Sequence, residues 1–259
     1  MRAALIQIGV DQDEPVDSRR DRAASLVRRQ TEADLVVLPE LWSVGAFAFD
    51  RFEAEAEPVP GGPTVQAMAD AARAAHVWLH AGSVVERAID GALYNTSLVF
   101  SPEGQLTATY RKIHRFGFDR GEATLMSAGT APVTAEAAGT TLGLATCYDL
   151  RFPELFRALT DAGAQVLAVP AGWPAARAAH WDLLARARAV ENQAYVLACG
   201  TAGTHAGVPQ AGRTAVIDPW GETLAAADDA TEQVVTADLD PARVAAVREE
   251  FPALKDRVL

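Results

Sequence analysis

The stretch that decides the fold is T-T-L-G-L-A-T-C-Y-D-L-R-F-P-E-L-F-R-A-L-T-D-A, residues 140–162. Its first part is apolar and rich in β-branched residues, which predicts a strand over residues 140–146. Pro153 suits the first turn of a helix that runs to about Ala162. Cys147 therefore lies where a strand gives way to a helix. A thiol in such a turn is held rigidly yet can face a pocket, so Cys147 is a candidate nucleophile.

Apolar runs and turn residues on both sides of this stretch predict strands that alternate with helices. The predicted helices are 17–30, 63–75, 178–192 and 241–250; Asp17 or Ser18 caps the first, and Asp240 caps the last. Residues 115–129 are rich in glycine and short polar side chains, which favours a loop. No break in composition and no repeat divides the chain, so we expect one α/β domain over residues 1–259 with mixed sheets. The other predicted strands are 3–8, 34–38, 77–85, 93–100, 105–112, 133–137, 165–170, 195–200, 213–217, 223–226 and 233–239.

The composition excludes several classes of protein. A net charge of −11 without a Lys/Arg cluster argues against nucleic acid as the partner. No uncharged apolar run approaches the roughly 18 residues of a membrane span, and the N-terminus lacks the apolar stretch of a signal peptide. Cys147 and Cys199 are too few for a disulfide framework. We therefore expect a cytoplasmic protein that binds neither membranes nor nucleic acid.

Two other segments supply possible partners for Cys147. Glu40 ends the apolar run L-V-V-L-P-E, and Lys112 lies in Y-R-K-I-H at the end of a predicted strand. Hydrolysis of an amide or nitrile by a thiol needs a base, donors for the oxyanion and an acid for the leaving nitrogen. Glu40 could serve as base and then acid. Lys112 and the backbone N–H of Tyr148 could face the oxyanion.

The residues alone leave other interpretations open. Cys147 could be a small core residue, Glu40 a helix cap, Lys112 a solvated strand end and Glu122 a loop carboxylate. Cys199 fits the core of a strand. A Cys–His pair using His114 or His180 also stays possible, although neither segment otherwise recommends it. The spacing of His and Cys provides no metal-ligand set, and no phosphate- or dinucleotide-binding motif is present, so we expect no metal and no cofactor.

Seven motifs, taken in order, resemble the nitrilase (carbon–nitrogen hydrolase) superfamily, and the similarity runs from Ala4 to about Val258. A single P-E or R-K pair would mean little, whereas the ordered set is specific. The motifs are L-V-V-L-P-E-L-W, G-A-L-Y-N-T-S-L-V-F, Y-R-K-I-H-R-F, T-C-Y-D-L-R-F-P-E-L-F-R, W-P-A-A-R-A-A-H-W, R-A-R-A-V-E-N-Q-A-Y-V and I-D-P-W-G-E.

The resemblance implies a four-layer α-β-β-α sandwich with a Glu-Lys-Cys triad, here Glu40, Lys112 and Cys147. In that family the Glu is the general base, the Cys is acylated and the Lys stabilises the tetrahedral intermediate. A second glutamate in the loop after the lysine contacts that lysine and positions the substrate; Glu122 in F-D-R-G-E is its best match. Family members also pair through helices near the nucleophile, here those from Pro153 and Ala178, so a homodimer or higher homo-oligomer is expected.

Within the superfamily, C-Y-D-L-R-F-P-E resembles the amidase-type branch, which includes ω-amidases and deaminated-glutathione amidases. True nitrilases usually carry C-W-E, and N-carbamoyl hydrolases often have two arginines after the cysteine, of which only Arg151 matches. Arg151 could hold a substrate carboxylate or form a salt bridge with Glu154 or Asp149. Gly172 departs from the A-N-W that this branch often has, which would enlarge or alter the pocket.

The predicted function is therefore hydrolysis of a small carboxylate-bearing amide through a Cys147 thioester, with release of ammonia. The alternative is an N-carbamoyl hydrolase that uses the same triad, and a non-catalytic binding protein is the third class. An active site of this kind should hold an accessible thiolate. We expect the substrate pocket to be shaped by aromatic side chains, namely Trp42, Phe47, Phe116, Tyr148 and Trp173.

Overall fold

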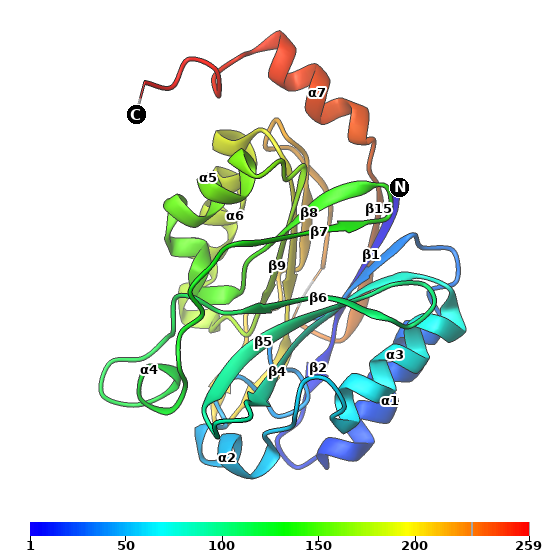
Figure 1. The fold of residues 1–259 in the computed structure, drawn as a ribbon, viewed down its shortest axis with the longest axis vertical. Helices are drawn as coiled ribbons and strands as arrows, with labels where there is room; N and C mark the ends of the chain where they lie inside the picture. Colours follow the sequence, from blue (N-terminus) through cyan, green and yellow to red (C-terminus); the bar gives the residue numbers. More distant parts are fainter. Residues whose placement is uncertain (229, 259) are drawn as a thin grey trace.

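The computed structural model describes residues 1–228 and 230–258 and contains two six-stranded sheets that lie face to face (Figure 1). Helices α1 (Val16–Arg28) and α3 (Pro63–Ala75) cover the outer face of one sheet. Helices α5 (Pro153–Asp161) and α6 (Ala178–Asn192) cover the outer face of the other. The expected four-layer α-β-β-α sandwich with mixed sheets is confirmed.

The first sheet contains the strands that lead to Glu40 and Lys112. Its central strands are parallel, and β4, β5 and β6 form an antiparallel meander. In spatial order the strands are β15 (Gln233–Asp238), β1 (Arg2–Gln7), β3 (Leu35–Val37), β4 (Trp78–Arg87), β5 (Leu93–Phe100) and β6 (Leu106–Arg111).

The second sheet contains the strand that leads to Cys147. Strands β8, β9 and β10 are parallel, so their carboxyl ends lie at one edge of the sheet. In spatial order the strands are β14 (Thr223–Ala226), β13 (Ala215–Ile217), β10 (Tyr195–Gly200), β9 (Val166–Ala171), β8 (Thr140–Leu144) and β7 (Val133–Ala137).

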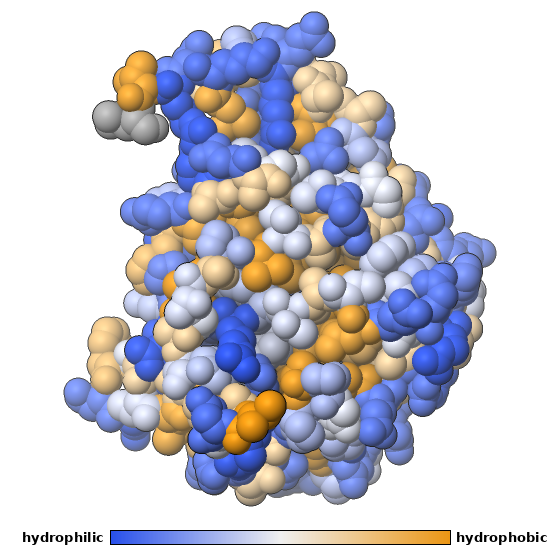
Figure 2. All heavy atoms as spheres, viewed as in Figure 1, coloured by the Kyte–Doolittle hydropathy of each residue, from blue (hydrophilic) through white to orange (hydrophobic). Residues whose placement is uncertain are grey.

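Alternation along β1 shows how the layers are packed. Ala3 and Leu5 belong to the core between the sheets, together with residues of β9 and β10. Ala4 and Ile6 belong to the core between the first sheet and helices α1 and α3. Because successive strand residues point to opposite faces, a strand covered on both faces is apolar throughout. Figure 2 shows the complement of this arrangement, with hydrophilic residues over the outward sides of α1 and α3 and over α7 (Pro241–Glu250).

The structure corrects two local predictions and contains one small sheet that was not predicted. Helix α1 begins at Val16, so neither Asp17 nor Ser18 caps it; Pro15 occupies the cap position, and Asp17 lies in the first turn, where it pairs with Arg20. The predicted loop 115–129 contains a short helix, α4 (Glu122–Leu125). A small third sheet of β2 (Gly9–Val10), β11 (Ala202–His205) and β12 (Val208–Pro209) was not predicted, because strands so short leave no periodic pattern.

The cap predicted for the last helix is confirmed, since the Asp240 side chain accepts a hydrogen bond from the Ala242 N–H at 2.9 Å. The described part of the chain holds no helix with the length and apolar character needed to cross a membrane.

Candidate active site

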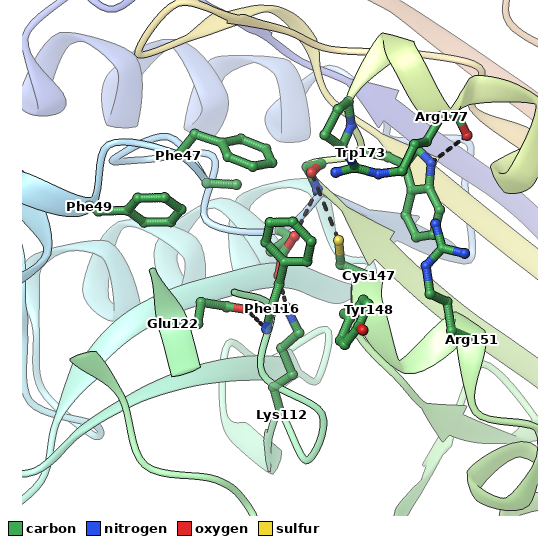
Figure 3. Close-up of a pocket in the computed structure, with 14 residues that line it drawn as sticks. Phe47, Phe49, Lys112, Phe116, Glu122, Cys147, Tyr148, Arg151, Trp173 and Arg177 are labelled. Carbon is green, nitrogen blue, oxygen red and sulfur yellow. Dashed lines mark hydrogen bonds and ion pairs between the residues drawn. The ribbon is translucent and has the colours of Figure 1, made fainter. Parts of the chain in front are cut away.

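Both sheets contribute to one pocket at the ends of their strands (Figure 3). Glu40 follows β3, and Lys112 follows β6, both in the first sheet. Cys147 follows β8, and Gly172 follows β9, neighbouring parallel strands of the second sheet. The pocket therefore lies between the two sheets and needs both of them.

The segment that carries Glu40 is pinned to strand β4. The Leu41 N–H donates to Ser83 Oγ at 3.0 Å. The carbonyl oxygen of Pro39 lies so close to Gly82 that a Cβ on residue 82 would come within 1.8 Å of it. Gly82 also has a φ of +65°, a conformation that glycine adopts without strain. Position 82 must therefore lack a side chain for Glu40 to occupy its place.

The turn that carries Cys147 is held by Asp149, which is fully buried. Its carboxylate accepts hydrogen bonds from the N–H of Thr146 at 2.9 Å, the hydroxyl of Tyr110 at 2.7 Å and the N–H of His114 at 3.0 Å. His114 Nδ1 lies a further 2.7 Å from the same carboxylate. Cys147 itself has a φ of +47°, uncommon for a residue with a side chain. Asp149 thus holds a strained nucleophile turn against the segment that follows Lys112.

Two buried carboxylates share one buried ammonium. Lys112 Nζ lies 2.7 Å from Glu40 Oε1 and 2.7 Å from Glu122 Oε2. Asn95 Nδ2 donates to the same two carboxylates, at 2.8 Å to Glu40 Oε1 and 2.6 Å to Glu122 Oε1. The Phe116 N–H donates to Glu122 Oε2 at 2.8 Å. All of these side chains except that of Phe116 are buried, so the charges interact in a poorly solvated site.

Gly172 lies between Glu40 and Cys147. Its N–H donates to Glu40 Oε2 at 2.9 Å, and its carbonyl oxygen lies 3.8 Å from Cys147 Sγ. The space that a side chain would take is occupied, because a Cβ on Gly172 would lie 2.4 Å from the methyl group of Ala46. The glycine thus alters the pocket without enlarging it, since Ala46 occupies that side.

The charges set the protonation of the site. Burial raises the pKa of the Cys147 thiol well above its ordinary value; Glu40 raises it further, and Lys112 only partly opposes this. Burial lowers the pKa of Lys112, but Glu122 and Glu40 outweigh burial and raise it well above normal. Burial also raises the pKa of Glu122. The raised pKa favours a neutral Cys147 thiol over a thiolate in the resting site.

Aromatic and cationic side chains form the rest of the pocket, which has about 390 Å³ of empty space. Trp42 was expected there but is fully buried against α3 and β4, and its indole N–H donates to the Ala81 carbonyl at 2.9 Å. The other four predicted aromatic residues do line the pocket. Its lining consists of Glu40, Ala46, Phe47, Phe49, Lys112, Phe116, Glu122, Cys147, Tyr148, Arg151, Gly172, Trp173, Pro174 and Arg177.

Two arginines of the lining have no carboxylate partner among the described residues. Arg151 does not pair with Glu154 or Asp149; it packs on the Trp173 ring at 4.9 Å and lies 3.2 Å from His180 Nδ1. The second is Arg177, whose guanidinium packs on the Phe116 ring at 5.3 Å. Both remain available for an anion.

Neither histidine considered as a base contacts Cys147, since His114 binds Asp149 and His180 lies against Arg151. Within residues 1–228 and 230–258, no group of three or more His, Cys, Asp or Glu side chains is arranged to hold a metal ion.

Sequence reasoning gave no role to Asn95 or Arg177. The antiparallel register of β5 and β6 could have indicated Asn95, because it lies opposite Lys112, whose N–H donates to the Asn95 carbonyl at 2.9 Å. Arg177 lies within the motif W-P-A-A-R-A-A-H-W, but the motif gave it no role, since its place in the pocket depends on the path of the loop after β9.

Comparisons with known proteins agree with this geometry. Residues 2–249 match the family model described as carbon–nitrogen hydrolase. A 2-oxoglutaramate amidase of Paenarthrobacter nicotinovorans is 40% identical over 98% of this chain and 88% of its own length. Omega-amidase NIT2 of Mus musculus is 35% identical over 99% of this chain and 94% of its own. The crystal structure of Saccharomyces cerevisiae Nit3, a member of branch 10 of the nitrilase superfamily, is 30% identical with a TM-score of 0.91, covering 100% of this chain and 97% of that one.

Asp149→Asn should destabilise the protein and weaken the nucleophile turn. In either orientation of the introduced amide side chain, its NH2 group replaces one carboxylate oxygen and faces hydrogen-bond donors that it cannot accept from. The free energy of unfolding should fall by roughly 2–4 kcal/mol. Chemical denaturation measures this loss. Asp182→Asn is the matched control: it breaks only the surface pair with Arg213 and should cost under about 1 kcal/mol. Equal losses in the two variants would contradict the role given to Asp149.

Proposed function

The chain belongs to the carbon–nitrogen hydrolase family as an amidase, and we propose that it cleaves a small carboxylate-bearing amide through a thioester on Cys147. The observation that carries the proposal is the convergence of Cys147, Glu40 and Lys112 in one pocket beside two unpaired guanidinium groups. The relatives named 2-oxoglutaramate amidase and omega-amidase act, by their names, on such amides.

In the acylation step, Glu40 accepts the proton of the Cys147 thiol while Sγ attacks the amide carbon. A neutral thiol beside a carboxylate suits this step, because no thiolate has to exist next to the buried carboxylates before the substrate arrives. The oxyanion of the tetrahedral intermediate takes hydrogen bonds from Lys112 and the backbone N–H of Tyr148. When the C–N bond breaks, protonated Glu40 gives its proton to the leaving nitrogen, and ammonia departs.

In the deacylation step, water replaces ammonia and Glu40 takes the proton of that water. The hydroxide attacks the thioester carbon, and the same donors hold the oxyanion. Collapse of the intermediate expels the sulfur, which regains its proton from Glu40, and frees the carboxylic acid. Glu122 supports both steps by holding the other side of the Lys112 ammonium.

Arg177 and Arg151 are the proposed partners of the substrate carboxylate. Both line the pocket that contains Cys147, and a guanidinium binds a carboxylate through two parallel hydrogen bonds. Trp173 and Tyr148 form the apolar walls that orient the acyl chain, with Phe116 beside them. Because Cys147 and both arginines line one pocket, an amide with a carboxylate at its far end could contact the thiol and a guanidinium together.

The N-carbamoyl hydrolase alternative has no comparable support, because the similar proteins named above are amidases. We also infer that the protein works in the cytoplasm, since both of its cysteines are free and buried. Fractionation of the cells that make it would test this; recovery from an oxidising compartment would refute it.

Cys147→Ala should abolish ammonia release from 2-oxoglutaramate while the fold persists, because the change removes little volume. Wild-type protein should produce ammonia without carbon dioxide, and intact mass after rapid mixing should show an acyl adduct that is absent from the variant. Turnover by the variant, or carbon dioxide released from an N-carbamoyl amino acid at a comparable rate, would refute the proposal.

Arg177→Gln should raise KM for an anionic ω-amide about 10- to 100-fold with little change in kcat, because it removes one charged partner. Hydrolysis of butyramide, which has no carboxylate, should be unchanged. The KM of Arg151→Gln for the same anionic amide, measured in parallel, shows how much each arginine contributes to binding the carboxylate. Arg28→Gln, at an exposed position of α1, is the control. If the anionic ω-amide and butyramide had equal KM values in the wild type and in every variant, recognition of the carboxylate would be excluded.

We infer a homodimer through α6. Leu183 and Val190 lie seven residues apart on one face of this helix and are 68% and 52% exposed. Leu183→Glu should convert the protein to a monomer in light scattering, because it buries a charge in the interface. Ile89→Glu, at the exposed turn between β4 and β5, should leave the mass unchanged. A wild-type mass near 27.5 kDa would rule the dimer out.

A further inference from the structure

We propose that Asn95 is a positioning residue for this reaction, and that its side-chain amide keeps Glu40 and Glu122 as two separate ionised carboxylates around Lys112. Glu40 then remains able to take the proton of Cys147. The proposal rests on the catalytic roles given above to these residues.

Asn95 contacts each member of the charged group. Its Nδ2 donates to Glu40 at 2.8 Å and to Glu122 at 2.6 Å, and its backbone carbonyl accepts from the N–H of Lys112 at 2.9 Å. It lies near the start of β5, between β4 and β6, and its side chain is buried. One residue in the body of a sheet therefore fixes the position of three side chains that come from loops and strand ends.

The orientation of the Asn95 amide is set by chemistry. Its Oδ1 is buried and has no hydrogen-bond partner among the described residues. A buried polar atom without a partner is unfavourable, and a flip of the amide would normally relieve it. Here the flip would point Oδ1 at two carboxylates and remove both hydrogen bonds. Asn95 Oδ1 is left unpaired because the amide is oriented so that its two N–H groups donate to Glu40 and Glu122.

The charge of the group explains why a neutral donor is needed. Two carboxylates, Glu40 and Glu122, converge on Lys112, which can supply only one positive charge. These three are the titratable residues that Asn95 contacts, and all three act on Cys147, whose raised pKa favours the neutral thiol. Two carboxylates whose oxygens converge on one nitrogen would otherwise share a proton, as paired carboxylic acids do. A shared proton would occupy the base.

The test uses the alkylation of Cys147 by iodoacetamide, which needs no knowledge of the substrate. Sγ forms a bond to the methylene carbon, iodide leaves with the bonding electrons, and Glu40 accepts the thiol proton. The rate is followed by intact mass between pH 5 and 9, and Cys147→Ala shows that no other residue is alkylated. Cys199 should not react, because it is fully buried.

In Asn95→Leu, the acid limb of the alkylation profile should move up by about one pH unit, so that the rate at pH 6 falls roughly tenfold. Asn95→Asp is nearly isosteric. It should be slower still at pH 8, where the introduced group adds a third negative charge. As the pH falls, the alkylation rate of Asn95→Asp should rise relative to that of Asn95→Leu, because the protonated carboxyl can donate a hydrogen bond in place of the amide.

Thr96→Val is the matched control, since Thr96 is the next buried residue on β5 but its hydroxyl bonds Glu86, outside the site. Its profile should equal that of the wild type. The proposal is overturned if Asn95→Leu and Asn95→Asp keep the wild-type profile, or if Thr96→Val shifts it as much. Should Asn95→Leu fail to fold, the pH dependence of Asn95→Asp decides. Absence of amidase activity in the wild type would refute the proposed function alone, because alkylation is measured independently.

Discussion

The ammonium of Lys112 lies 2.7 Å from carboxylates of both Glu40 and Glu122, in a place where none of the three side chains meets appreciable solvent. Burying charge is unfavourable unless every charge has a partner, and removing one partner leaves the others uncompensated. The surrounding structure reflects this demand. Asn95 and the Gly172 N–H each satisfy a carboxylate oxygen that the ammonium does not contact, and the Phe116 N–H adds a second donor to Glu122 Oε2. The site therefore forms as a unit.

This unit holds the base ready and the nucleophile neutral. Many thiol enzymes lower the pKa of their cysteine so that a thiolate exists before the substrate arrives. Here burial and Glu40 raise the pKa of Cys147, and in the proposed mechanism its proton moves only during attack. The arrangement needs close contact between base and thiol, and Gly172 provides it by touching both through its backbone. A glycine also lets Ala46 approach, so the first sheet's loop closes on the second sheet's strand end.

The fold class and most elements could be predicted from the sequence because apolar periodicity and turn residues are local signals. The bounds of α6 were predicted to the residue, whereas α1 began before its expected cap because Pro15 sets the entry angle. Glu40, Lys112 and Cys147 stood out because each ends a strand within a specific motif. The contacts of Asn95, the place of Arg177 and the burial of Trp42 depend on segments far apart in the chain, which no single window of sequence contains.

Cys147 belongs to the second sheet, while Glu40 and Lys112 belong to the first, so the thiol gains its base only when the two sheets have packed. A newly made chain with only one sheet formed carries an unassisted cysteine, mostly neutral and slow to react at physiological pH. The fraction of Cys147 that reacts with a small amide-like electrophile therefore measures the fraction of molecules in which the two sheets have packed together. Such labelling would report formation of the native state.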